Sequence, residues 1–171
     1  MSALMDFLLR NAGNRGMMAT LRCALVESTQ MRAWPLLARF DGMGGTQRAR
    51  AVRTVAGLFA VHPENCNDGN MGTVCRRLCG SDEKPWEVGE NGNAAPGPVG
   101  RRFMHLLNAD REEICDRVCR LVRQAGSRGI PVNYAALEKD LTEWPRAREA
   151  WAAEFWAPVK EGEAEKEGGE R

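Results

Sequence analysis

Apolar side chains recur every three or four residues along nearly all of this chain, outside the stretches rich in glycine or acid. That spacing puts them on one face of an α-helix, whereas a half-buried strand needs strict alternation. No run of alternating β-branched residues occurs. The chain is therefore predicted to be all-α, a bundle of about eight helices in two packed halves. Its 171 residues can bury a core without disulfides or metal.

The clearest helix is predicted over residues 46–61. Successive residues of a helix turn by about 100°, which puts Val52 and Phe59 on a core face. Arg50 and Arg53 fall on the opposite face, so this helix is predicted to have one apolar and one basic side.

Later helices are marked by their starts. Asp110 and Glu113 have capping-box spacing and open a helix that ends near Gly126. Asn133 is the expected N-cap of the next helix, and Pro145 is expected in the first turn of the last one. The aromatic residues expected in the core are Phe59, Phe103, Trp144, Trp151 and Phe155.

Residues 81–98 are rich in glycine, asparagine and proline and are predicted to be a flexible loop. This loop separates an N-terminal helical half, residues 1–80, from a C-terminal half, residues 99–159. Residues 160–171 are mostly Glu, Gly and Lys, and are predicted to be a disordered acidic tail.

The net charge of +1 hides an uneven distribution of charge. The basic residues are 20 Arg and only 4 Lys. Net charge is +5 over residues 1–80, −3 over 81–98, +3 over 99–137 and −4 over 138–171. Arginine suits phosphate because its planar fork donates two hydrogen bonds and keeps its charge.

The sequence indicates a cytoplasmic protein. Charged residues interrupt every apolar run before it reaches the length of a membrane span, and no secretion signal begins the chain. Its six cysteines are then expected to be reduced.

The sequence argues against an enzyme. It contains no GxSxG, HExxH or P-loop pattern. His62 and His105 stand alone and are interpreted as structural, as is Asp140. No catalytic residue, cofactor or small-molecule substrate is predicted.

The cysteines allow two interpretations. Cys75/Cys79 and Cys115/Cys119 are pairs spaced four residues apart on predicted helices, and four thiolates from two packed helices could hold zinc. Cys75 and Cys115 also lie on or beside apolar stripes, where a free cysteine packs as a small hydrophobic residue. We favour the core interpretation and predict no metal.

Arginines on several helices lie away from the apolar stripes, with few acids nearby. This favours phosphate binding without base readout, although a merely solvated helix surface would show the same pattern. From this placement the candidate binding residues are Arg15, Arg22, Arg50, Arg53, Arg76, Arg77, Arg120 and Arg123.

A set of motifs resembles a known family. IPVNYAALEKDLTEW (130–144) and WAAEFW (151–156) are similar to the C-terminal half of the small subunit of type I-E CRISPR Cascade, the CasB family. RGMMATLR (15–22), AVRTVAGLFAVHP (51–63) and NMGTVCRRL (70–78) resemble its N-terminal motifs in the same order.

The resemblance implies an all-helical subunit without catalytic activity, present in two copies beside other Cascade subunits. It implies sequence-independent contact with the crRNA–target DNA hybrid and the displaced DNA strand, which stabilises the R-loop. It adds Arg101 and Arg102 to the candidates, and it supports Arg22, Arg53, Arg76 and Arg77. Two alternatives are a helical regulator with a cysteine-based metal or redox site, and a general RNA chaperone.

Overall fold

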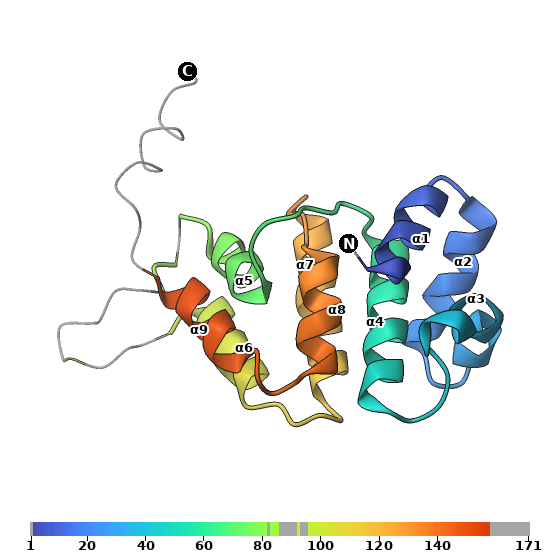
Figure 1. Cartoon of the computed structure of the whole chain (residues 1–171). Coiled ribbons are helices and arrows are strands. Elements are labelled where there is room, and N and C mark those ends of the chain that lie inside the picture. Colours follow the sequence, from blue (N-terminus) through green and yellow to red (C-terminus); the bar gives the residue numbers. More distant parts are fainter. Residues whose placement is uncertain (1, 82, 86–91, 93–95, 158–171) are drawn as a thin grey trace, which may run out of the picture.

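In a computed structural model of the chain, the described residues are 2–81, 83–85, 92 and 96–157. Over these residues the chain forms nine α-helices and three short 3-10 helices and no strand, so the predicted all-α class is confirmed (Figure 1). The α-helices are α1 (Ala3–Asn11), α2 (Arg15–Arg22), α3 (Trp34–Leu37), α4 (Gln47–Val61), α5 (Met71–Cys79), α6 (Pro98–Leu107), α7 (Ile114–Ser127), α8 (Tyr134–Thr142) and α9 (Arg148–Trp156). The 3-10 helices are η1 (Cys23–Leu25), η2 (Gln30–Ala33) and η3 (Ala38–Phe40).

The helices are arranged in three groups. Figure 1 shows α7 and α8 between α4 on one side and α5, α6 and α9 on the other. Helix α4 packs on α8 and α7, and α5 packs on α9 and α6, so each contact joins a helix before the 81–98 loop to one after it. A single cluster of buried apolar side chains runs through all three groups. Most of the predicted loop, and the predicted tail 160–171, lie outside the described residues.

The predicted basic face of α4 is wrong. Every residue from Ala51 to Ala60 is buried, because other helices cover α4 on all sides along this stretch. Helix α2 and η1 cover the face that was expected to meet solvent. There a Cβ on Gly57 would come within 2.5 Å of Leu25 Cγ, so glycine permits the close approach.

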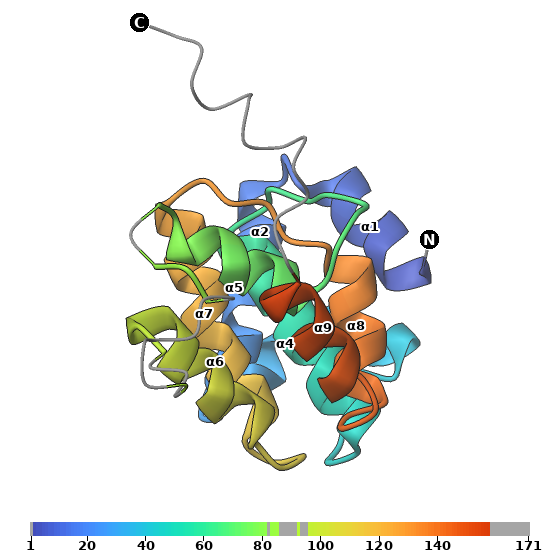
Figure 2. The same ribbon diagram turned by 90° about the vertical axis from the view of Figure 1, so that its left-hand side faces the viewer.

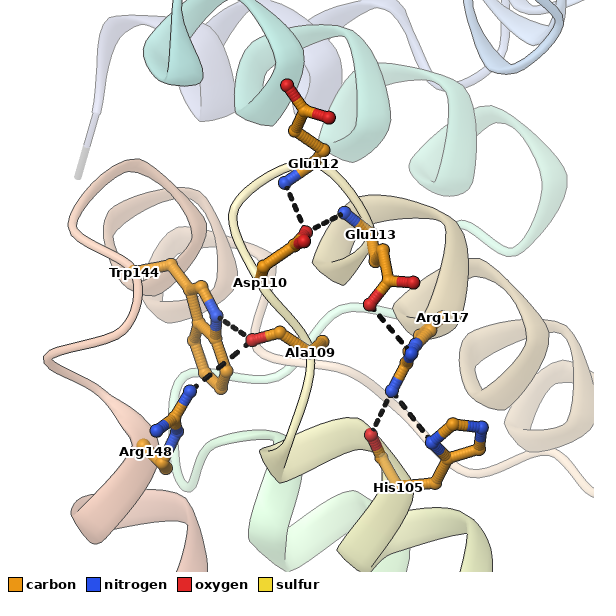
Figure 3. Close-up of polar contacts among 8 residues, drawn as sticks. All are labelled: His105, Ala109, Asp110, Glu112, Glu113, Arg117, Trp144 and Arg148. Carbon is orange, nitrogen blue, oxygen red and sulfur yellow. Dashed lines mark hydrogen bonds and ion pairs between the residues drawn. The ribbon is translucent and has the colours of Figure 1, made fainter.

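The cap predictions are confirmed in part. The Asn133 side chain accepts a hydrogen bond from the Ala136 N–H at 3.0 Å, as an N-cap does. Asp110 accepts from the N–H groups of Glu112 and Glu113 at 2.8 and 2.9 Å (Figure 3). Glu113 does not complete the capping box, because its carboxylate instead pairs with Arg117 at 2.7 Å.

The predicted start of the last helix is wrong. Pro145 lies in a turn, and α9 begins at Arg148. The indole of Trp144 is buried and donates to the Ala109 carbonyl at 2.9 Å (Figure 3). The chain turns after this anchor and brings Trp151 against Trp144, with ring centroids 4.9 Å apart.

The aromatic core prediction is confirmed. The predicted aromatic residues are all no more than 1% exposed. Phe103 stacks on Phe155 with centroids 4.1 Å apart, and Phe59 meets Tyr134 edge to face at 5.5 Å. Within the part of the chain that the structure describes, few rings are left for stacking on nucleic-acid bases. The described helices include none that is long and apolar enough to cross a membrane.

Candidate nucleic-acid interface

One side of α7 carries a ridge of exposed polar residues. Asp116, Arg120, Arg123 and Ser127 are all exposed, at spacings that place them along one line on the helix. The opposite side of α7 is buried in the core. Arg120 and Arg123 therefore project into solvent about one turn apart, as the sequence predicted.

Helix α6 extends this ridge. The Arg102 guanidinium donates to Gln124 Oε1 on α7 at 2.9 Å, and Arg101 beside it is exposed. Figure 2 shows α6 and α7 next to each other. We call the four arginines Arg101, Arg102, Arg120 and Arg123 the α6–α7 basic surface. The sequence alone does not show that these two pairs meet, because the Arg102–Gln124 contact spans 22 residues.

Arg117, which the sequence did not single out, holds the two helices in register. Its guanidinium donates to the Glu113 carboxylate and to His105 Nδ1 at 2.7 and 2.8 Å, and also to the His105 backbone carbonyl (Figure 3). These bonds join the first turn of α7 to the last turn of α6. They commit Arg117 to structure and help to fix the position of Arg102.

The two arginines of α5 have different environments. Arg77 is exposed, whereas Arg76 is half-buried and donates to the Glu154 carbonyl on α9 at 3.4 Å. Nearby, Arg128 donates to the Leu78 carbonyl at 2.6 Å and ties the end of α7 to α5. Arg77 therefore has the freer guanidinium of the α5 pair.

The two predicted arginines of α2 lie in another part of the fold. Arg15 is exposed at the first position of α2. Arg22 is also exposed, but its Nε donates to the Ala60 carbonyl at the end of α4, at 2.9 Å. In Figure 1, α4 lies between α2 and α7, so these residues do not belong to the α6–α7 basic surface.

The predicted exposure of Arg53 is wrong. Arg53 is only 8% exposed, and its guanidinium donates to the carbonyls of Gly42 and Gly44, both at 2.8 Å. Burial, together with the charge of Arg50, lowers the pKa of Arg53. The buried guanidinium holds the glycine-rich turn before α4 in place. It is therefore not available to a phosphate at the surface.

Arg50 lines a cleft of about 530 Å³ between α4 and α7, which we call the α4–α7 cleft. Its walls combine arginine, carboxylate and apolar groups. The lining residues are Ala24, Leu25, Glu27, Gln30, Trp34, Gly44, Gly45, Arg50, Arg53, Thr54, Glu112, Cys115, Asp116 and Cys119. Sequence reasoning missed this cleft, because its walls come from four separate stretches of chain.

The histidines and Asp140 make structural contacts, as predicted. Buried His62 places Nε2 2.8 Å from the Ile130 carbonyl, and His105 contacts Arg117. The Trp151 indole donates to Asp140 Oδ2 at 2.6 Å. Burial raises the pKa of Asp140, and the Trp151 hydrogen bond opposes that rise.

The core interpretation of Cys75 and Cys115 is confirmed, since they are 0% and 7% exposed. Burial raises the pKa of Cys79 and of Cys119 to about 12, and it also raises those of Cys75 and Cys115. Within the described residues, no three His, Cys, Asp or Glu side chains are placed to hold one metal ion.

Comparison of the structure with solved proteins identifies the fold. CasB from Thermus thermophilus superposes with a TM-score of 0.69 at 23% identity, covering 92% of this chain and 100% of that one. M. ruber CasB gives 0.65 at 20% identity over 98% of each chain, and CasB from Thermobifida fusca gives 0.60 at 20% identity over 90% of each.

Comparison of the sequence identifies the family. No curated protein matches the chain. The sequence model of the family described as CRISPR-associated protein Cse2 matches residues 17–156, most of the 171-residue chain. This match runs from within α2 to the end of α9 and includes every predicted arginine except Arg15. The chain therefore belongs to the Cse2 family, the CasB subunits of the CRISPR Cascade complex.

Proposed function

We propose that this chain is the nucleic-acid-binding small subunit of a type I-E Cascade and has no catalytic activity of its own. In the complex it pairs with a second copy of itself. It supports the crRNA–target DNA hybrid and holds the displaced DNA strand, which keeps the R-loop open during antiviral defence. The observation that carries this proposal is the α6–α7 basic surface, where exposed arginines from two helices lie side by side.

Contacts with the nucleic-acid backbone are sufficient for this role. An RNA–DNA hybrid is about as stable as the DNA duplex that it replaces, so modest binding of phosphates can favour the open state. Arg120 and Arg123 are exposed, and Arg102 has donors besides the one that bonds Gln124, so each can donate to phosphate oxygens.

The binding is expected to be independent of sequence. The predicted aromatic residues are buried, and the half-exposed Trp156 packs its ring edge to face on Phe103, with centroids 5.5 Å apart. Stacking on free rings and reading of base edges therefore contribute little, and the phosphate contacts dominate.

The other predicted arginines divide by environment. Exposed Arg15 and Arg77 remain candidate phosphate contacts, and so do Arg22 and Arg76 with part of their donors in use. Arg50 is a weaker candidate because it lies in the cleft, and we no longer propose Arg53.

The test replaces Arg120 and Arg123 together by alanine. The isolated variant should bind single-stranded DNA more weakly at low salt. Its log–log salt dependence should be shallower by about one unit for each arginine that contacts a phosphate. In the assembled complex the footprint on the displaced strand should shrink, while loading of guide RNA stays unchanged.

The matched control replaces Arg10 and Arg146, two exposed arginines outside α6 and α7. It removes the same charge and should keep the parent's salt slope. If both double variants fold, assemble and protect the strand as well as the parent, the α6–α7 surface is not the interface. Strong binding of free RNA without any dependence on Cascade would favour the RNA chaperone, and stoichiometric zinc would favour the regulator.

A further inference from the structure

The α4–α7 cleft has the opposite charge character to the α6–α7 basic surface. Glu27, Glu112 and Asp116 line it and are exposed, and none of them forms an ion pair within the described residues. Two arginines also line it, but Arg53 is already bonded to backbone carbonyls. Hydrogen bonds to neutral carbonyls leave that charge in place, so the lining carries three carboxylates against two guanidinium groups, a net charge of −1, and the three carboxylates are its exposed charged groups.

One residue that lines the cleft carries an unmet hydrogen-bonding group. Trp34 lines the cleft, and its indole Nε1–H is buried without an acceptor, the one such side-chain atom among the described residues. A buried donor without an acceptor destabilises the fold. The nitrogen is covered in this structure, so a bound carbonyl oxygen would satisfy it once the Trp34 side chain turns toward the cleft.

Exposed apolar side chains adjoin the cleft along the chain. Val26, Met31 and Met43 are 50%, 62% and 49% exposed, and each directly neighbours a lining residue in sequence. Large apolar side chains beside a polar cleft are typical of a protein interface, in which methionine adapts to the shape of the partner.

We propose that the α4–α7 cleft docks a segment of a different protein subunit of the complex, one that presents a lysine or arginine beside an apolar side chain. The basic group pairs with Glu112 and Asp116, and its aliphatic stem lies along Leu25 and Trp34. The apolar neighbour packs on Met31 and Met43. Arg50 and the Trp34 indole donate to backbone carbonyls of the same segment.

The charges favour such a segment over nucleic acid. A base inserted in the cleft would bring its two flanking phosphates to the mouth, beside the carboxylates of Glu27, Glu112 and Asp116. The phosphates and these carboxylates would repel each other, whereas the carboxylates attract a basic peptide.

A crosslinking experiment identifies the occupant. A photoreactive phenylalanine analogue is placed at Met31 or Met43 in the purified, assembled complex, with the same analogue at exposed Leu9 on α1 as the control. The cleft positions should crosslink to one peptide of another Cas subunit, and that peptide should contain lysine or arginine. Leu9 should not crosslink to that peptide.

Charge reversal tests the pairing. Glu112→Lys should weaken retention of the chain in the complex by about tenfold or more, because it places like charges opposite each other. Reversal of the crosslinked basic residue to glutamate should restore retention. Glu149→Lys, at an exposed position on α9, should have no effect. Trp34→Phe should weaken retention, while the isolated chain still folds.

Three outcomes would overturn the proposal. They are crosslinks to nucleic acid or to the second copy, no difference in retention between Glu112→Lys and Glu149→Lys, and loss of DNA binding by isolated Glu112→Lys. The proposed nucleic-acid function is measured separately on the Arg120 and Arg123 variant, so either proposal can fail without the other.

Discussion

Arg50 and Arg53 lie less than one turn apart on α4, yet their guanidinium groups have different roles. Arg53 lies under the glycine-rich turn and donates hydrogen bonds to two backbone carbonyls. Arg50 faces the open cleft. The neighbouring chain decides the difference, because the turn at Gly42–Gly45 folds over one arginine and leaves the other uncovered.

Arg53→Ala is expected to destabilise the protein by about 2–4 kcal/mol, because it leaves a void and removes the donor from the buried bond to the Gly42 carbonyl. Urea unfolding followed by circular dichroism measures this change. Arg48→Ala is the control, since Arg48 pairs with Asp41 at 3.1 Å on the exposed surface and should change stability by less than about 0.5 kcal/mol. Equal stability of the two variants would show that the Arg53 contacts do not stabilise the fold.

The thiols of α5 and α7 also take their character from burial. Burial raises the pKa of Cys79 and of Cys119 to about 12, which disfavours their thiolate forms at neutral pH. The spacing of four residues in each pair follows from a helical core stripe, which accounts for it without a metal.

At the scale of elements, the start of α6 depends on the loop before it. The Glu83 carboxylate accepts from the N–H groups of Val99 and Gly100 at 3.0 and 2.7 Å. These are free donors of the first turn, and a negative charge also complements the helix dipole. Part of the loop predicted to be flexible is therefore attached to α6, the helix that carries Arg101 and Arg102.

Glu83→Ala should lower the free energy of unfolding by about 1 kcal/mol, and Glu83→Gln, which keeps an acceptor, should lower it by less. Urea unfolding of the three proteins measures the order. An alanine variant as stable as the parent would mean that water caps α6 equally well.

At the scale of the whole molecule, the described helices share one core. Contacts between α4 and α8 and between α5 and α9 join distant parts of the sequence, so neither half buries its apolar face alone. The two sequence halves are therefore expected to unfold together.

Leu8→Ala on α1 tests this cooperativity. Leu8 is fully buried, and its truncation should cost about 2–5 kcal/mol. In a background with Trp34→Phe and Trp86→Phe the remaining tryptophans are Trp144, Trp151 and Trp156, so fluorescence reports on the C-terminal half. Fluorescence and circular dichroism should show the same shift in midpoint. A fluorescence midpoint unaffected by Leu8→Ala would indicate two independent halves.

Several features of the protein follow from local sequence. The all-α class, the Asn133 cap and the burial of Cys75 and Trp151 depend on periodicity and on residues within one or two turns. The helix at residues 3–11 had the same kind of signal, in the cap Ser2 and the apolar Leu4 and Leu8, but was not predicted. Such features can be predicted because a helix repeats its own geometry whatever it packs against.

Other features were decided by tertiary structure. Periodicity identifies the side of a helix that is less apolar, but it cannot show whether another segment covers that side. Helix α2 and η1 cover α4, the Gly42–Gly45 turn buries Arg53, and Trp144 fixes the turn that delays α9 to Arg148. The α6–α7 basic surface and the α4–α7 cleft likewise bring together residues far apart in the chain. Sequence determined which residues could meet solvent or core, and long-range packing decided which of the arginines remained exposed.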